Sequence, residues 1–407
     1  MCPNCGSTTF SKNGYKTKTV KHCTYYTFAF IVKCHIQGYK CRSCKHFFYE
    51  KDTFSFPNET VSKETTFAIL DKLKYANITF QSVARDLHLS RQNIIDTFDK
   101  YVDYYPSSSL PEIMSWDEKH INKSLTDHAY SFIILDFKEV KIFDMIVSRH
   151  KNMITKYFSS FSKEKRDAVK YITMDMWEPY KDVALKLFRN AKIAIDSFHV
   201  MNTLNNAINK IRLSVMQKYN LKTDELDDND PYYYVLKKYK HYLVKEFDDI
   251  PTKRFYNKKL KMWFDKHSLR KYILDIDDSL SKAYWFVTRY RELNETASFK
   301  TVKNEFLEII DEMYNSNIEP LINAAKTLST WQEYIINSFI TIDDALDDKG
   351  KPRRLSNGPI EGINSQIQKI NTNGNGYTNF WRFRNRCIYV INKEYSILGK
   401  PKKRKKK

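Results

Sequence analysis

The chain has 407 residues, with 68 Lys and Arg against 48 Asp and Glu, which gives a formal net charge of +20. At about 100–200 residues per domain, this length predicts two to four folding units. Hydrophobic residues make up 42% and charged residues 29%, a balance typical of globular proteins. The longest apolar stretches, such as residues 131–135, are too short to cross a bilayer, which argues against a transmembrane protein. Because the sequence opens on Met1-Cys2, we also expect no secretory leader.

The surplus of positive charge predicts a polyanionic partner, and nucleic acid is the usual one because each neutralised phosphate releases counterions. Aromatic residues reach 15%, and some of them are expected at surfaces where they could stack on bases. The alternative is a Lys-rich surface that reflects biased codon usage. Charge alone therefore favours a nucleic-acid-binding protein without establishing one.

Cysteine spacing is the clearest local signal. Six of the seven cysteines lie in the first 44 residues, where Cys2-Pro3-Asn4-Cys5 and Cys41-Arg42-Ser43-Cys44 form two C-x-x-C pairs. Two such turns suit a tetrahedral Zn²⁺ site, and the strand-like sequence between them is typical of a zinc ribbon. We therefore predict a structural Zn²⁺ bound by Cys2, Cys5, Cys41 and Cys44. The alternatives are unrelated buried thiols, a redox pair, or substitute ligands among His22, Cys23, Cys34 and His35.

Residues 80–95 predict a helix-turn-helix. Apolar side chains recur at 83, 84, 87, 89, 94, 95 and 98, and Ser90 is suited to cap the second helix. That helix would present Arg91, Gln92 and Asn93 at its N-terminal end, where a recognition helix meets base edges in the major groove. A helix near Ser62–Tyr75 would complete a three-helix module. The alternative is an ordinary helical hairpin.

Acidic residues follow two predicted core strands. Strand patterns at 113–116, 129–137 and 140–147 predict a three-strand meander, and helices then alternate with strands near 171–174 and 191–195. This order is expected of a ribonuclease-H-like α/β core, in which carboxylates on the first and fourth strands lie adjacent. Asp117 and Asp175 occupy those positions.

A third carboxylate, Glu361, would lie in the first turn of a helix that Gly358 and Pro359 begin. Three converging carboxylates in a basic protein suit two Mg²⁺ or Mn²⁺ ions, which prefer oxygen ligands and can support phosphodiester displacement. For any single acidic residue at a strand end, a solvent-exposed position without a ligand is the ordinary alternative.

Three segments together resemble the DDE transposases of bacterial insertion sequences, most closely the ISL3 family: Tyr171–Tyr180, Ile195–Val200 and Ser356–Asn364. The resemblance covers nearly the whole chain, since that family also carries a zinc ribbon and a helix-turn-helix. It implies that Asp117, Asp175 and Glu361 form the catalytic triad. Asp196 and His199 look like the D-x-x-H element of related transposases, although His199 could also be a satisfied core histidine.

The 185 residues between Asp175 and Glu361 exceed what a compact core needs, so the resemblance implies an all-helical insertion. Trp285 in that insertion is a candidate for stacking on an extruded base, and helix core is the alternative. Arg382, Arg384 and Arg386 are expected to line DNA after the catalytic helix, and a solvated basic face is the alternative.

The predicted fold class is a multidomain α/β protein in which an all-helical insertion interrupts the ribonuclease-H-like core. The expected units are a zinc ribbon (1–50), a helix-turn-helix (51–105), a first core part (106–210), the insertion (211–345), a final core part (346–395) and a flexible basic tail (396–407). The tail could bind phosphates or be an added tag.

We therefore expect a transposase that binds terminal inverted repeats, cleaves DNA with Mg²⁺ and joins the free 3′-hydroxyl to target DNA. Joining two ends predicts a homodimer or larger assembly, and a bacterial origin predicts a cytoplasmic, nucleoid-associated protein with no membrane partner. The alternatives are a catalytically inactive, repressor-like DNA-binding protein and a structure-selective nuclease without strand transfer.

Overall fold

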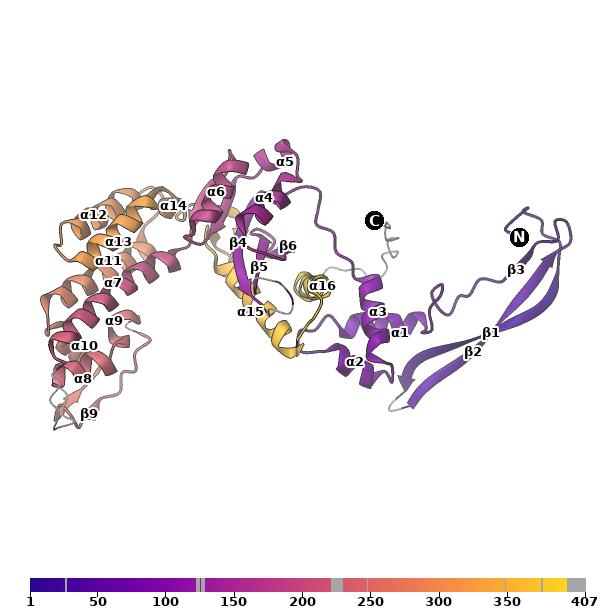
Figure 1. Ribbon diagram of the computed structural model, residues 1–407, viewed down its shortest axis with the longest axis horizontal. Helices are drawn as coiled ribbons and strands as arrows, with labels where there is room; N and C mark the ends of the chain where they lie inside the picture. Colours follow the sequence, from indigo (N-terminus) through magenta and orange to yellow (C-terminus); the bar gives the residue numbers. More distant parts are fainter. Residues whose placement is uncertain are drawn as a thin grey trace.

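The computed structural model describes residues 1–25, 28–121, 125, 129–220, 230–246, 248–347, 349–374 and 376–393. The molecule is elongated, with a β-hairpin at one end, a mixed sheet in the middle and a helical arm at the other end (Figure 1). The predicted basic tail, 396–407, lies outside the described residues. Within the described ranges, no helix is both long and apolar enough to span a membrane.

The N-terminal part is a long antiparallel hairpin of β1 (Phe10–Tyr25) and β2 (Phe28–Cys41), to which the short β3 (Phe47–Tyr49) is added. One face of the hairpin packs on the following segment. Lys18 binds Asp52 at 2.9 Å, and the His22 ring lies 2.8 Å from the Ser62 hydroxyl. The opposite face is open to solvent.

Three short helices follow: α1 (Lys63–Lys72), α2 (Phe80–Asp86) and α3 (Arg91–Tyr101). Each begins at a hydroxyl residue, because the Ser62, Thr79 and Ser90 side chains accept backbone N–H groups that the first turn leaves unpaired. The predicted cap at Ser90 and the predicted upstream helix are confirmed. Val83, Ile94 and Phe98 are fully buried in the core between the helices.

The central sheet has the strand order β6-β5-β4-β7-β8. Its strands are β4 (Ile113–His120), β5 (Tyr130–Asp136), β6 (Lys141–Ile146), β7 (Tyr171–Met174) and β8 (Lys192–Ile195). The first three are antiparallel, whereas β7 and β8 run parallel to β4. The predicted meander, followed by two further core strands, is therefore present.

Both faces of the sheet are buried. Phe132 and Ile134 of β5 face one hydrophobic core, and Ile133 and Leu135 face the other. Helices α4 (Lys151–Ser159), α5 (Lys163–Asp167) and α6 (Glu178–Leu187) lie on the first side. Helices α15 (Gly358–Asn373) and α16 (Phe380–Asn392) lie on the second (Figure 1).

The arm separates β8 from α15 in the sequence. Its helices are α7 (Ser197–Lys218), α8 (Pro231–Lys238), α9 (His241–Val244), α10 (Lys266–Leu274), α11 (Asp278–Thr296), α12 (Val302–Tyr314), α13 (Glu319–Thr330) and α14 (Gln332–Asn337). Helix α7 is long and runs from the sheet into the arm, where it contacts α11 and α13. Its buried face shares the apolar core of the sheet.

The prediction of an all-helical insertion is wrong in one detail. β9 (Phe255–Asn257) and β10 (Met262–Phe264) form a small antiparallel pair within it. The Asn257 side chain accepts the backbone N–H groups of Lys259 and Leu260 and so closes the turn. β11 (Thr341–Leu346) and β12 (Pro352–Arg354) form a second pair before α15. The three-residue strands β9, β10 and β12 are too short for a period-two pattern to reveal.

Candidate active site

Asp117 and Asp175 lie side by side where the pairing of β4 with β7 ends. Asp175 directly follows β7, whereas Asp117 lies within β4, which continues to His120 instead of ending before Asp117 as predicted. The parallel register pairs Ser115 of β4 with Thr173 of β7, so the residues two positions further on lie side by side. Ligand oxygens of Asp117, Glu118 and Asp175 all lie within 4.8 Å of one another. The prediction that the two aspartates come together is therefore met by the backbone register.

The electrostatics of this pair favour a bound cation. Burial, together with the negative charge of Asp175, raises the pKa of Asp117 to about 7. Neighbouring carboxylates repel one another, and a cation between them favours their ionised form. Such a pair therefore favours cation binding. The donor set is made of oxygens alone, which suits Mg²⁺ or Mn²⁺ rather than a softer metal.

Asn357, directly before α15, is the centre of a buried polar network. Its side-chain amide donates to Asp175 at 3.0 Å and to the Trp116 carbonyl at 3.3 Å, and its amide oxygen accepts from the Thr173 hydroxyl at 2.7 Å. Its backbone N–H donates to Asp196 at 2.6 Å. This one residue, 1% exposed, joins the ends of three strands to the start of α15.

Asn364, two turns into α15, performs the same task for Asp117. Its amide nitrogen donates to Asp117 at 2.5 Å, and its buried amide oxygen has no hydrogen-bond partner within the part of the chain that the structure describes. Neither Asn357 nor Asn364 was predicted to have a role at the site. The only sequence signal was their spacing of seven residues, which places both on one face of a helix.

Glu361 departs from the prediction of three converging carboxylates. It lies in the first turn of α15 and is exposed, and the group within 4.8 Å contains Glu118 instead. Glu361 is still close enough to be coupled to the site, because burial and the charges of Asp196 and Asp175 raise its pKa. Glu118 has both oxygens occupied: Arg149 donates to one at 2.6 Å and the Tyr180 hydroxyl to the other at 2.7 Å.

Asp196 and His199 both touch this network. Asp196 caps α7 by accepting the Phe198 N–H at 2.8 Å, and the Nε2 of His199 lies 2.8 Å from Asp175. Burial alone would lower the pKa of His199, but the hydrogen bond to Asp175 and its charge prevail and raise it. The contact with Asp175 therefore favours the protonated form of the imidazole. His199 is not the satisfied core histidine of the alternative interpretation, because it faces the acidic pair.

The family assignment agrees with this geometry. The model of the ISL3-type DDE transposase family, described as a transposase, matches residues 114–387. The chain belongs to this family. The match spans Asp117, Asp175 and Glu361, whereas the hairpin and α1–α3 lie outside it. Among curated proteins, none matches the sequence significantly.

The transposase carries a second candidate site at the outer end of its hairpin. The sulfurs of Cys2, Cys5, Cys41 and Cys44 lie within 4.8 Å of one another, with two contacts of 3.6 Å. Backbone N–H groups at the second C-x-x-C turn lower the pKa of Cys41 to about 6. The proposed substitute ligands lie elsewhere: His35 is bonded to Thr17 and Cys23 accepts from Thr65.

Three residues predicted to read DNA lie at the start of α3, where Arg91 and Gln92 are exposed and Asn93 is half-buried. Gln92 is bonded to Asp96 at 2.7 Å. In the arm, Trp285 is 48% exposed, so the alternative that it belongs to the helix core is wrong. It lines a hollow of about 550 Å³ between α11 and α12, and the Arg289 guanidinium lies 5.0 Å from its ring centre.

The prediction that three arginines of α16 line DNA fails for two of them. Arg384 and Arg386 are 4% and 1% exposed, so neither guanidinium can reach a phosphate. Arg384 forms an ion pair with Asp144 of β6, and Arg386 donates to backbone carbonyls after α1. Arg382 is partly exposed but bound to Asp99 of α3. The basic stripe that suggested a DNA surface is therefore an internal packing surface.

Proposed function

We propose that this transposase binds the terminal inverted repeats of an insertion sequence, cleaves DNA at the element end and joins the free 3′-hydroxyl to target DNA. The strand order, three antiparallel strands followed by two parallel ones, supports a ribonuclease-H-like core. The single observation that carries the proposal is the adjacency of Asp117 and Asp175 on neighbouring parallel strands within the matched family range.

The residues of the site fit divalent metal ions. Asp117, whose pKa is raised, and the buried amide oxygen of Asn364, which has no hydrogen-bond partner among the described residues, are both groups that a bound cation would stabilise. We propose that Asp117, Asp175 and Glu361 hold two Mg²⁺ or Mn²⁺ ions. When bound, such ions activate the attacking oxygen and stabilise the leaving oxygen in phosphodiester displacement.

The surrounding side chains hold the carboxylates in place. Asn357 and Asn364 each fix one aspartate through an amide N–H, which leaves other carboxylate lone pairs available to a cation. His199 donates to Asp175 and limits the negative charge of the site before DNA arrives. Glu361, exposed in the first turn of α15 and coupled to the charge of Asp175, would complete the set of ligands.

The four-cysteine group fits a structural Zn²⁺. A tetrahedral site with Zn–S bonds of about 2.3 Å has sulfurs about 3.8 Å apart, close to the two 3.6 Å contacts. Such an ion would fix the outer end of the hairpin. It would perform no chemistry, because four thiolates leave no open coordination position.

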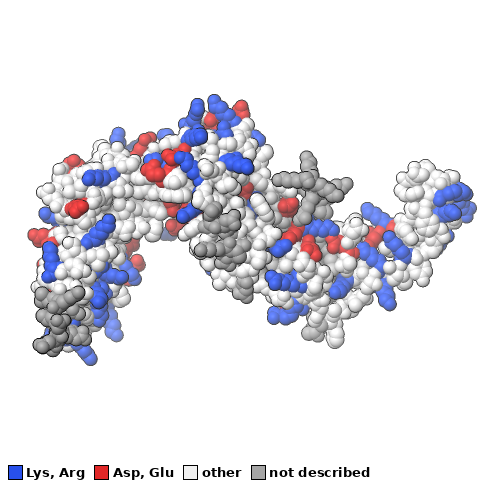
Figure 2. Space-filling view, viewed as in Figure 1, with Lys and Arg blue, Asp and Glu red and all other residues white. Residues whose placement is uncertain are grey.

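We propose that DNA contacts the open face of the hairpin and the start of α3. Residues 1–50 carry eight Lys and Arg against a single Glu, and Figure 2 shows basic side chains gathered at the outer end of the hairpin. A two-stranded ribbon and a helix N-terminus both fit the major groove. Arg91, Gln92 and Asn93 would read bases, Trp285 would stack on a base released near the cut, and two copies would join the two ends.

The test is cleavage of labelled duplexes that contain the ends of the element itself, taken from DNA that flanks the coding region. Asp175→Asn should lower Mg²⁺-dependent cleavage on the order of a thousandfold or more while binding persists. The matched control is Asp136→Asn, another half-buried aspartate at the end of a strand, whose side chain accepts the backbone N–H groups of Lys138 and Glu139 in the turn that follows. That variant should cleave normally.

The outcomes separate the alternatives. Tight binding without cleavage by the wild-type protein would favour the repressor-like protein. Cleavage without joined products would favour a nuclease. Equal loss in the Asp175→Asn and Asp136→Asn variants would indicate a folding defect and would contradict the assigned role of Asp175. Detection of the protein with the nucleoid in bacterial cells would test its proposed cytoplasmic location.

A further inference from the structure

Helix α16 has two faces that serve two different parts of the molecule. Phe383, Cys387 and Ile388 pack against β5 and β6 of the sheet. Residues at positions i, i+3, i+4 and i+7 on the other face point at α1–α3. We call these four residues, Arg382, Asn385, Arg386 and Tyr389, the docking face.

The docking face binds the C-terminal half of α3. The Arg382 guanidinium donates to both oxygens of Asp99, at 2.7 Å to 3.1 Å. Such a bidentate pair fixes direction as well as distance, because the planar guanidinium matches the carboxylate at two points. Asn385 adds a bond of 3.0 Å to the Val102 carbonyl, which ends α3.

The same face also binds α1 and the turn that follows it. The buried Arg386 donates to the carbonyls of Tyr75 and Ile78 at 2.9 Å and 2.8 Å. The Tyr389 hydroxyl donates to the Leu70 carbonyl at 2.9 Å. Every one of these bonds joins positions more than 250 residues apart, so the docking depends wholly on tertiary structure.

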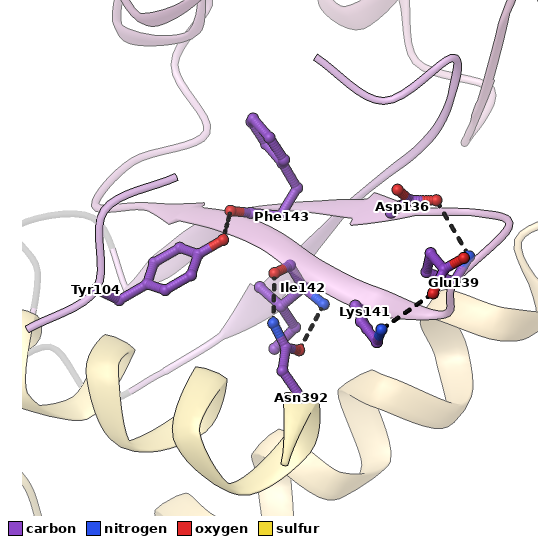
Figure 3. A pocket seen from close by; sticks show the side chains of 7 residues that line it. All are labelled: Tyr104, Asp136, Glu139, Lys141, Ile142, Phe143 and Asn392. Atoms are coloured by element: carbon purple, nitrogen blue, oxygen red, sulfur yellow. Dashed lines mark hydrogen bonds and ion pairs between the residues drawn. The ribbon is translucent and has the colours of Figure 1, made fainter. Parts of the chain in front are cut away.

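On the side of the sheet, α16 is anchored equally firmly. The Asn392 side chain pairs with both the N–H and the carbonyl of Ile142 at 2.9 Å and so takes the place of a neighbouring strand on the edge of the sheet (Figure 3). Tyr104, in the segment after α3, donates to the Phe143 carbonyl at 2.9 Å. Arg384 forms a buried ion pair with Asp144. The segment between α3 and β4 is therefore not the sole connection between α1–α3 and the sheet, because α16 binds both.

We propose that α16 is a rigid support that fixes the distance and rotation between the start of α3 and the acidic pair, with Arg382 and Arg386 as positioning residues. The inference rests on the proposed function, because it concerns where DNA bound at α3 is cut. Rigid docking sets a fixed number of base pairs between the recognised sequence and the cleaved bond. A loosely tethered module would tolerate other spacings.

The test varies that spacing. Footprinting first identifies the sequence that the protein covers near the element end. Two duplexes are then compared: the natural one, and one with five base pairs inserted between the covered sequence and the cleaved bond. Five base pairs rotate the helix by about half a turn and add about 17 Å. We expect the wild-type protein to cleave the natural duplex at least about tenfold faster than the lengthened one.

Charge reversal then breaks the support. Asp99→Lys should reduce the ratio of the two cleavage rates to below about threefold, and Asp99→Lys combined with Arg382→Asp should restore it. Arg386→Met, which keeps the apolar stem and removes both carbonyl bonds, should reduce the ratio as well. Asp182→Lys, which places a second cation beside Lys151 on the far side of the sheet, is the matched control and should leave the ratio unchanged. Circular dichroism melting verifies that each variant folds.

The rate ratio separates positioning from stability, because a general loss of folded protein lowers both rates alike. A wild-type protein that cleaves both duplexes equally would overturn the inference and leave the proposed function intact. An Asp99→Lys or Arg386→Met variant that folds and retains the wild-type ratio would overturn it as well. If the wild-type protein cleaves neither duplex with Mg²⁺ or Mn²⁺, the proposed function itself fails.

Discussion

The side-chain amide of Asn357 donates to Asp175 at 3.0 Å across 182 positions of sequence. The bond joins the residue that precedes α15 to the residue that follows β7, the parallel neighbour of the strand that bears Asp117. The catalytic helix of the proposed mechanism is therefore fixed to the sheet by a side chain that is not itself a ligand. Loss of this bond would therefore affect the orientation of Asp175 more than the stability of the fold.

Asn357→Ala is expected to reduce the free energy of unfolding by about 1–3 kcal/mol, because it leaves buried partners of the amide unsatisfied. Cleavage should fall further than stability explains, since Asp175 loses its orientation. Urea denaturation and single-turnover cleavage measure the two effects. Asn190→Ala removes an exposed bond to the Asp167 carbonyl and should change neither by much. Equal effects of the two substitutions would contradict the role of Asn357.

Asp117→Asn is expected to stabilise the protein at neutral pH in Mg²⁺-free buffer. Burial and Asp175 raise the pKa of Asp117 from 3.8 to about 7, so between these values the folded state binds more protons than the unfolded state. The stability of the wild-type protein should therefore fall as pH rises through this window and level off above it. The Asp117→Asn variant has no carboxyl group to ionise at this position, so it lacks this loss of stability.

Urea denaturation between pH 4.5 and 8 measures the difference between the two proteins, which should grow with pH. Added Mg²⁺ should raise the wild-type midpoint and have less effect on Asp117→Asn, because binding to the folded state alone stabilises it. If the difference in stability between the wild-type protein and Asp117→Asn changed neither with pH nor with Mg²⁺, the raised pKa of Asp117 would be contradicted.

Asp144→Ala is expected to reduce the free energy of unfolding by about 3–5 kcal/mol, because it leaves the buried Arg384 guanidinium without its counterion. The double variant Asp144→Ala with Arg384→Met should be less destabilised than the sum of its parts. Thermal melting of the single and double variants measures the coupling. Lys151→Ala, which breaks a half-exposed pair with Asp182, should cost less than about 1 kcal/mol.

Cys41→Ser is expected to abolish binding of one Zn²⁺ per chain and to loosen the outer end of the hairpin. Metal analysis of the purified protein and hydrogen exchange of residues 1–50 measure both effects. Cys34→Ser is the matched control on the same strand, since Cys34 lies outside the four-sulfur group, and it should retain the ion. Retention of zinc by the Cys41→Ser variant would point to a different ligand set.

Local patterns in the sequence were sufficient for several features. The C-x-x-C pairs predicted the four-sulfur group, and Ser90 predicted the start of α3, because caps and turns depend on neighbouring residues. Strand periodicity placed Asp175 directly after β7, and the parallel register brings Asp117 beside it. The predicted end of the first strand before Asp117 was wrong, because β4 continues to His120.

Only the tertiary structure decided which polar side chains became buried and with which partners. The arginines of α16 looked like a basic surface, yet Arg384 and Arg386 are enclosed by groups from distant parts of the chain. Likewise the partners of Asn357 could not be predicted from its position before a helix, and Glu118 rather than Glu361 joins the two aspartates in the group of ligand oxygens within 4.8 Å. Burial and pairing of a polar group depend on contacts across hundreds of positions, which local periodicity does not encode.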